Sequence, residues 1–431
     1  MRKEINKEIL AIALPAIVSN VTTPLLGLVD TAIVGHIGSA TYIGAIALGS
    51  TMFNLLYWLF GFLRMSTAGL TSQSFGSSDF LQSCRNLKRS MLLAVTFSLL
   101  LLLLSPWLGP IVLNFLDADD TVQPLAIQYF RIVIWGAPAV LGTYVLNGWL
   151  LGMQNTRLPM MVAIVTNIFN IILSASLVFG LGMKIEGVAI GTLTSQWLGF
   201  AICMVALWRK YSPVKVGINE LINLPALRRI FKLNIDIFLR TLCMIIVTAW
   251  FTRSGATQGV EILAANALLM QMFMFFSYFS DGFGFAGEAL AGKYYGMNDS
   301  VGLKSVEHLL LIWGGWIALA FTILYFFCGD FVLKLLTDDK ALISVTLKYL
   351  PWAVCVPFCG IMAFIYDGIF VGLTLTRRML ISVAAGMVAF FAIYYGFKAM
   401  LGNHALWIAF LAYLLIRGVS LKLLLPKCVL K

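Results

Sequence analysis

Long apolar segments follow one another along the whole chain, separated by short polar stretches. Each is long enough, and poor enough in charge, to cross the roughly 30 Å hydrocarbon core of a bilayer as a helix. Helices also satisfy their backbone hydrogen bonds internally, as the bilayer requires. We therefore predict an all-α polytopic membrane protein with twelve transmembrane helices. The predicted spans lie near 9–34, 43–71, 89–113, 123–152, 157–181, 186–209, 228–253, 259–290, 305–328, 345–372, 378–400 and 404–425.

The second half of the chain repeats landmarks of the first half at a constant offset of 220 residues. The matching pairs are Gly35 and Gly255, Gly76 and Gly296, Asp79 and Asp299, Gly148 and Gly368, Gly152 and Gly372, and Arg157 and Arg377. An internal duplication in a membrane protein is typical of transporters built from two halves around a central site. Because six spans per half is an even number, both halves enter from the same side. We predict two six-helix lobes, related as parallel repeats, around a central cleft.

Positive charge is concentrated on one side of this predicted topology. Most of the 30 lysines and arginines fall in one set of loops, which includes the polar stretch 210–227. By the positive-inside rule these loops are cytoplasmic, and so are both termini. The predicted domains are an N-terminal lobe over 1–209, a cytoplasmic linker over 210–227 and a C-terminal lobe over 228–431. We find no small-residue cleavage site of a signal peptide near Met1.

The composition excludes several classes of protein and of binding site. The chain is 60% hydrophobic and only 11% charged, with a mean hydropathy of +0.92, which excludes an ordinary soluble domain. The net charge of +11 fits contact with anionic lipid at the inner face rather than with nucleic acid. The seven cysteines form no CxxC pair and the three histidines lie near loops, so we expect no metal and no other cofactor. No obligate protein partner is evident.

Asp30 is the most informative ionisable residue within a predicted span. It lies in an otherwise apolar stretch, and its counterpart in the second half is Trp250, so the carboxylate belongs to one half only. Apolar surroundings favour the protonated form of a carboxyl group, so Asp30 can hold a proton near neutral pH. The alternative is an interfacial aspartate without a role. Pro24 in the same span predicts a kink, which is either a hinge or a static bend.

A polar cluster in the fifth and sixth spans accompanies Asp30. Asn170 and Ser174 are four residues apart and share a helix face, Asn167 lies one turn earlier, and Thr192 lies on the next span. The second half has no equivalent set. The pattern indicates a proton or cation site in the first half, and hydrogen bonds that merely hold helices together are the alternative.

The second half carries its own ionisable residues at membrane depth. Such groups normally face a cavity or a partner, because exposing them to lipid is unfavourable. Asp236 and Arg240 are four residues apart on the seventh span, and their spacing predicts a pair on one helix face. A structural ion pair is the favoured interpretation of these two residues.

The remaining charges within spans are harder to assign. Asp281 and Glu288 share a face of the eighth span, and we expect Arg64 of the second span to be their partner across the cleft. Asp367 corresponds to Asn147, so that position is polar in both halves. These residues either bind substrate or lock helices together, and the sequence leaves both possibilities open.

Several stretches resemble multidrug and toxic compound extrusion (MATE) transporters, and in particular their DNA-damage-inducible F (DinF) branch. The stretches are Ala13–Pro15, Leu26–His36, Phe62–Thr67, Asn147–Gly152 and Gly402–Trp407. The resemblance implies two six-helix lobes and exchange of a drug for H⁺ or Na⁺ by alternating access. It also implies that Asp30 is the coupling residue and that Asn170 and Thr192 belong to the cation site. Ser174 stands where many members have aspartate, which disfavours a tight Na⁺ site because hard cations prefer anionic oxygen ligands.

The sequence therefore predicts an inner-membrane antiporter, and not an enzyme, that exports amphiphilic, cationic compounds in exchange for protons. Na⁺ coupling remains an alternative. A flippase for a lipid-linked precursor is a second alternative, although the charges within the spans do not favour an anionic headgroup. A membrane-embedded enzyme would need a paired-Asp, His-Glu or Ser-Lys constellation, which the chain lacks. A passive channel is disfavoured by the duplication around a central site.

Overall fold

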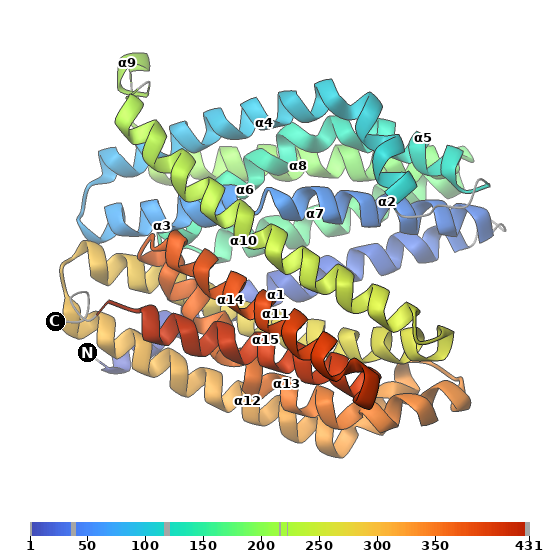
Figure 1. The fold of residues 1–431 in the computed structure, drawn as a ribbon. Helices are drawn as coiled ribbons and strands as arrows, with labels where there is room; N and C mark the ends of the chain where they lie inside the picture. Colours follow the sequence, from blue (N-terminus) through green and yellow to red (C-terminus); the bar gives the residue numbers. More distant parts are fainter. Residues whose placement is uncertain (1, 36–39, 116–120, 215–216, 222, 427–431) are drawn as a thin grey trace. The chain divides into compact units, whose positions relative to one another are not determined.

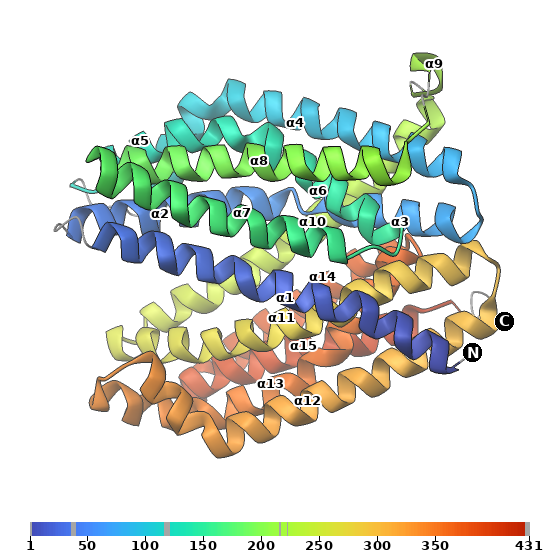
Figure 2. The ribbon, with the colours of Figure 1, turned by 180° about the vertical axis from the view of Figure 1, so that it is seen from behind.

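The computed structural model describes residues 2–35, 40–115, 121–214, 217–221 and 223–426, and the regular elements in these ranges are all helices (Figures 1 and 2). The first half contains α1 (Arg2–Gly35), α2 (Ala40–Leu59), α3 (Phe62–Gly76), α4 (Phe80–Phe115), α5 (Gln123–Val133), the 3-10 turn η1 (Ile134–Gly136), α6 (Ala137–Gly152), α7 (Arg157–Ala175), the π turn η2 (Ser176–Gly180) and α8 (Ile185–Tyr211). The second half contains α9 (Ile218–Leu221), α10 (Leu224–Ala256), α11 (Val260–Gly296), α12 (Ser300–Leu336), α13 (Lys340–Gly372), α14 (Thr376–Leu401) and α15 (Asn403–Leu424). The predicted all-α fold is confirmed.

The helix lengths agree with the predicted membrane topology. Among the described residues, 11 helical stretches are long and apolar enough to cross a membrane. α10 is the remaining long helix, with 33 residues, and its first half carries charges that include Asp236 and Arg240. Counting α10, the long helical stretches match the twelve predicted spans. The protein is therefore a multi-pass membrane protein.

The helices pack into two compact units whose boundaries fall inside helices. The first-half unit is Val18–Ile230, and the second-half unit combines Met1–Ile17 with Phe231–Lys431. Packing therefore divides the chain within α1 and within α10, whereas the sequence suggested a division at the linker 210–227. Each of these two helices contributes to both units.

Specific contacts hold the beginning of α1 in the second-half unit. Lys293 on α11 places its Nζ 2.6 Å from Glu8 Oε1. Trp313 on α12 donates through Nε1 to Asn6 Oδ1 at 3.1 Å. Gly282 on α11 has no side chain, and an added Cβ there would lie 3.0 Å from the carbonyl oxygen of Ala13. Polar contacts and close packing together fix this first part of α1.

A helix crossing in which a glycine brings two backbones into contact occurs at equivalent positions of the two halves. In the first-half unit, α6 packs on α3 at Gly148, where an added Cβ would overlap the carbonyl oxygen of Arg64. In the second-half unit, α13 packs on α11 at Gly368, where an added Cβ would overlap the carbonyl oxygen of Gly284. Gly148 and Gly368, and likewise positions 64 and 284, are 220 residues apart. The duplication therefore preserves an individual backbone contact.

The helix that meets this glycine is interrupted in the first half and continuous in the second half. α2 and α3 are separate helices joined at Phe60 and Gly61, whose N–H groups bond to the carbonyls of Tyr57 and Trp58 in a tight turn. The equivalent positions in the second half are Ser280 and Asp281, which lie within the unbroken α11. Asp281 therefore belongs to a continuous helix.

We expect Gly148→Ala to lower the apparent unfolding temperature of the purified protein in detergent. The added methyl group meets backbone atoms of α3, which cannot move aside as a side chain can, and overpacking of this kind destabilises by about 1–3 kcal/mol. Gly315→Ala is the matched control, because a Cβ at this position of α12 has no neighbour within 4 Å. Equal unfolding temperatures for the two variants would contradict this account of the crossing.

Candidate ion-coupling site

The polar cluster predicted for the first half is assembled between α7 and α8, which lie side by side (Figure 2). Asn170 on α7 donates through Nδ2 to Thr192 Oγ1 on α8 at 3.4 Å. Ser174 lies one turn further along α7, and both it and Asn170 are buried. Gly191 lets α8 approach this point, because an added Cβ would overlap Ser174 Oγ. The structure thus brings Asn170, Ser174 and Thr192 together.

Two oxygens of this cluster are buried without a partner. Neither Asn170 Oδ1 nor Ser174 Oγ makes a hydrogen bond within the described part of the chain. Buried polar atoms are nearly always hydrogen-bonded, and leaving one unsatisfied costs about 1–3 kcal/mol. Oxygens of this kind can accept a hydrogen bond from a protonated group or ligate a cation. The cluster is therefore chemically suited to a site that is filled in one state and empty in another.

The helix geometry next to Ser174 is irregular. α7 ends at Ala175 and continues as the π turn Ser176–Gly180. Single π turns within α-helices are rare and are often found at functional sites. The corresponding helix of the second half, α14 (Thr376–Leu401), is continuous. The irregularity therefore accompanies the polar cluster and is specific to the first half.

α7 is also tied to the helix that carries Asp30. Asn167 donates through Nδ2 to the carbonyl oxygen of Thr22 on α1 at 3.3 Å. The backbone of α1 continues as a helix through Pro24 and Asp30, but the side chains of these two residues lie outside the described part of the structure. The hinge at Pro24 and the coupling role of Asp30 therefore stay predictions. The Asn167 contact lies two residues before Pro24.

The second-half unit contains a buried cluster of charges, and its pairing differs from the sequence prediction. Arg240 on α10 pairs with Asp367 on α13 and not with Asp236. Arg417 on α15 donates through Nη2 to the same oxygen, Asp367 Oδ2, at 2.6 Å. Arg417 also donates through Nη1 to Tyr413 Oη at 3.3 Å, and its guanidinium lies over the Tyr413 ring. We call Arg240, Asp367 and Arg417 the charged triad.

The expected pair of Asp236 with Arg240 was wrong because each residue has other partners. Asp236 is buried and accepts a hydrogen bond from Thr376 Oγ1 at 3.1 Å, and it lies 3.7 Å from Nη1 of the exposed Arg377. Arg240 extends from the same helix to α13 instead. The i,i+4 spacing brings two side chains within reach, but contacts with other helices decide the pairing.

Arg417 was not expected at this site. The positive-inside pattern assigns Arg417 to the cytoplasmic charges, but its side chain is only 3% exposed. Its position within the predicted span 404–425 could have indicated that Arg417 is buried. A guanidinium at that depth requires an acid, and Asp367 supplies it.

The other predicted residues lie on helices of the two units. Arg64 lies on α3 of the first-half unit and is half-buried. Asp281 and Glu288 lie on α11 of the second-half unit, where Glu288 is buried and its carbonyl oxygen packs against Gly372. The pairing of Arg64 with these acids therefore stays a prediction.

A neutral network at one end of the second-half unit was also missed. Asn266 and Asn403 exchange two amide hydrogen bonds of 2.8 and 2.9 Å, and Trp407 donates through Nε1 to Asn266 Oδ1 at 2.9 Å. Asn403 and Trp407 belong to the stretch Gly402–Trp407, which carried part of the family resemblance. These residues join α15 to α11, so this stretch has a packing role.

Comparisons with known proteins agree with this architecture. The family model MatE matches residues 15–175 and 234–395, two segments that follow the duplication. DNA damage-inducible protein F of Escherichia coli K12 is 37% identical, over 96% of this chain and 91% of that protein. The probable multidrug resistance protein NorM of Thermotoga maritima is 24% identical, over 80% of this chain and 75% of that protein.

Solved structures show the same fold. A crystal structure of MATE in the bent conformation superposes with a TM-score of 0.88 at 20% identity, covering 98% of this chain and 95% of that chain. A crystal structure of MATE in the straight conformation gives a TM-score of 0.85 at 19% identity, covering 97% and 95%. At these identities the likeness establishes the fold alone.

We expect Asp367→Asn to destabilise the protein strongly. The substitution leaves two buried guanidiniums without their carboxylate, and removing one partner of a buried ion pair typically costs about 3–5 kcal/mol. Asp236→Asn is the matched control, because its partners are a hydroxyl and an exposed arginine and because asparagine can still accept from Thr376. Thermal unfolding of both purified variants in detergent checks the prediction. It fails if the two variants unfold at the same temperature.

Proposed function

Because the chain belongs to the MatE family, we propose that it is a secondary active antiporter that exports amphiphilic, cationic compounds in exchange for protons. The observation that carries the proposal is the pair of buried, unpartnered oxygens of Asn170 and Ser174 beside Thr192. Efflux is supported by the name of the NorM relative, a probable multidrug resistance protein. We place the protein in the bacterial inner membrane with both termini cytoplasmic.

The identity of the cluster residues favours a proton over Na⁺. Asn170, Ser174 and Thr192 supply neutral oxygens only, whereas tight binding of a hard cation favours anionic ones. A proton needs only one titratable group, and Asp30 on α1 is the candidate. In this proposal a protonated Asp30 donates to the open acceptors of the cluster, and a deprotonated Asp30 does not.

Coupling follows if proton and drug prefer opposite states of the transporter. We propose that deprotonated Asp30 favours the inward-open, drug-bound state. Protonation from the outer side then changes α1 near Pro24 and releases the drug. The contact of Asn167 with Thr22 supplies a physical connection between the cluster and this part of α1. Each ligand shifts the equilibrium only by its difference in affinity for the two states.

We expect Asp30→Asn to abolish proton-driven transport. Ethidium flux into or out of proteoliposomes under an imposed pH gradient, with and without Na⁺, measures this directly. Asp330→Asn is the matched control, because Asp330 is an exposed acid that pairs with the neighbouring Lys334. Normal flux in Asp30→Asn would disprove coupling through this residue. Flux of the wild type driven only by Na⁺ would favour the alternative ion, and no flux under either gradient would favour a lipid substrate.

We expect Asn170→Ala to weaken transport without weakening the fold. The substitution removes a buried oxygen that has no partner among the described residues and one long hydrogen bond, of 3.4 Å, to Thr192, so its structural cost is small. Loss of a coupling contribution of typical size lowers proton-driven flux at least about fivefold. Thr194→Ala on the exposed face of α8 is the control, since its hydroxyl bonds only to its own helix at Ile190. A parallel fall in flux and in unfolding temperature would indicate a structural role instead.

A further inference from the structure

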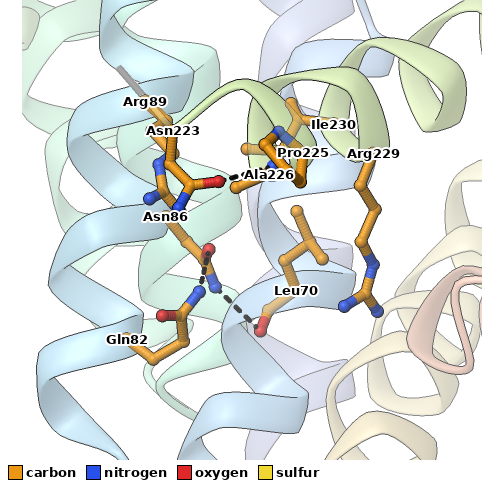
Figure 3. A pocket seen from close by; sticks show the side chains of 9 residues that line it. All are labelled: Leu70, Gln82, Asn86, Arg89, Asn223, Pro225, Ala226, Arg229 and Ile230. Atoms are coloured by element: carbon orange, nitrogen blue, oxygen red, sulfur yellow. Dashed lines mark hydrogen bonds between the residues drawn. The ribbon is translucent and has the colours of Figure 1, made fainter. Parts of the chain in front are cut away.

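A cavity of about 300 Å³ opens in the first-half unit where α3 ends and where α4 and α10 begin (Figure 3). Arg89 of α4 and Arg229 of α10 line it, together with the amides of Gln82 and Asn86. Its apolar lining includes Leu70 and Ile230. None of the residues that line the cavity is an acid. The lining therefore combines two positive charges with neutral amides and hydrocarbon.

Arg89 is held in place without an acidic partner of its own. Arg89 is only 4% exposed. It donates a hydrogen bond through Nη2 to the carbonyl oxygen of Glu220 at 2.6 Å and another through Nε to the carbonyl oxygen of Leu221 at 3.3 Å. The carboxylate of Glu220 is bonded by Arg85 at 2.7 Å. Arg89 thus reaches neutral acceptors only, and its Nη1 has no acceptor among the described residues.

Arg229 supplies a second cationic group from the other side of the cavity (Figure 3). It is exposed, and it makes no hydrogen bond or ion pair with any residue that the structure describes. Asn86 is fixed between them, because its Nδ2 donates to the carbonyl oxygen of Leu70 at 3.3 Å and its Oδ1 accepts from Gln82 at 3.1 Å. A ligand in the cavity would meet the fixed guanidinium of Arg89 and the exposed guanidinium of Arg229.

The depth of the cavity matches the headgroup region of a bilayer. The first turns of α4 are polar and carry Arg85 and Arg89, and the helix then becomes apolar. Leu92, Val95 and Leu99 on the following turns are exposed, as expected for side chains that face lipid. Since a helix rises 1.5 Å per residue, Arg89 lies only about one turn from this hydrocarbon-facing surface.

We propose that this cavity binds the phosphate headgroup of an anionic phospholipid of the cytoplasmic leaflet. Guanidinium groups match the geometry of phosphate oxygens and form charge-assisted hydrogen bonds with them. Basic cavities between membrane helices on the cytoplasmic side are suited to such headgroups. The apolar lining at Leu70 and Ile230 accommodates the part of the lipid next to the phosphate. A bound lipid would join α4 to the beginning of α10 and so steady the linker that connects the two halves.

Lipid binding can be measured by native mass spectrometry and by thermal unfolding of the full-length protein in detergent, with added phosphatidylglycerol or phosphatidylcholine. We expect phosphatidylglycerol, but not phosphatidylcholine, to be retained and to raise the unfolding temperature. Arg229→Gln should weaken phosphatidylglycerol binding about fivefold, the contribution typical of one arginine near a membrane surface. Arg228→Gln is the matched control, because it removes the same charge from the neighbouring residue, which does not line the cavity.

Three outcomes would overturn the proposal. The first is equal phosphatidylglycerol binding by Arg229→Gln and Arg228→Gln. The second is equal stabilisation by the two lipids. The third is equal stabilisation by water-soluble glycerol phosphate, which would identify a free phosphate and not a lipid as the ligand. Arg229→Lys should retain part of the binding, and the unfolding temperature of Arg229→Gln without lipid checks that the variant folds.

Discussion

Close backbone contact between helices at Gly148 and at Gly368 is the constraint on which the rest of this structure depends. At Gly148 and at Gly368 a helix backbone lies directly against the carbonyl of its neighbour, at a distance that no side chain would permit. In a membrane, such contact is a main source of helix association, because burial from water contributes little there. The crossing also fixes the residue before each glycine, which is Asn147 in one half and Asp367 in the other. A polar position is thus built into both copies of the repeat.

The two halves satisfy that polar position in different ways. In the second-half unit Asp367 receives two guanidiniums, from Arg240 and Arg417. The positions equivalent to these arginines in the first half are Asn20 and Trp197, and Asn147 Oδ1 is buried without a partner among the described residues. Conversely, the positions equivalent to Asn170 and Ser174 hold Phe390 and Tyr394, which are buried and stacked. The second half thus pairs Asp367 with two guanidiniums, whereas the first half leaves oxygens of Asn147, Asn170 and Ser174 without a partner among the described residues.

The duplication, the helices and the first-half cluster could be predicted because they depend on local or periodic signals. Apolar length gives the spans, the 220-residue offset gives the repeat, and four-residue spacing places Asn170 and Ser174 on one face. The charged triad could not be predicted in the same way, because its members come from α10, α13 and α15. Helical spacing suggested Asp236 as the partner of Arg240. The long guanidinium side chain of Arg240 instead reaches across to Asp367 on another helix, and Asp236 bonds to Thr376. The contact of Asn167 with the backbone of Thr22 depends equally on tertiary packing.

This division of polar chemistry favours the first half as the place where an ion acts. A site responds to an ion only if its occupancy can change between states of the protein. The charged triad resists such change, because losing the Asp367 carboxylate would leave two buried guanidiniums without their acid. The acceptors of Asn170 and Ser174 have no such restraint, and a donor or cation that reaches them gains hydrogen bonds that the empty cluster lacks. Asn167 on the same helix bonds to α1 just before Pro24, and this contact supports the proposed connection between the cluster and the helix that carries Asp30.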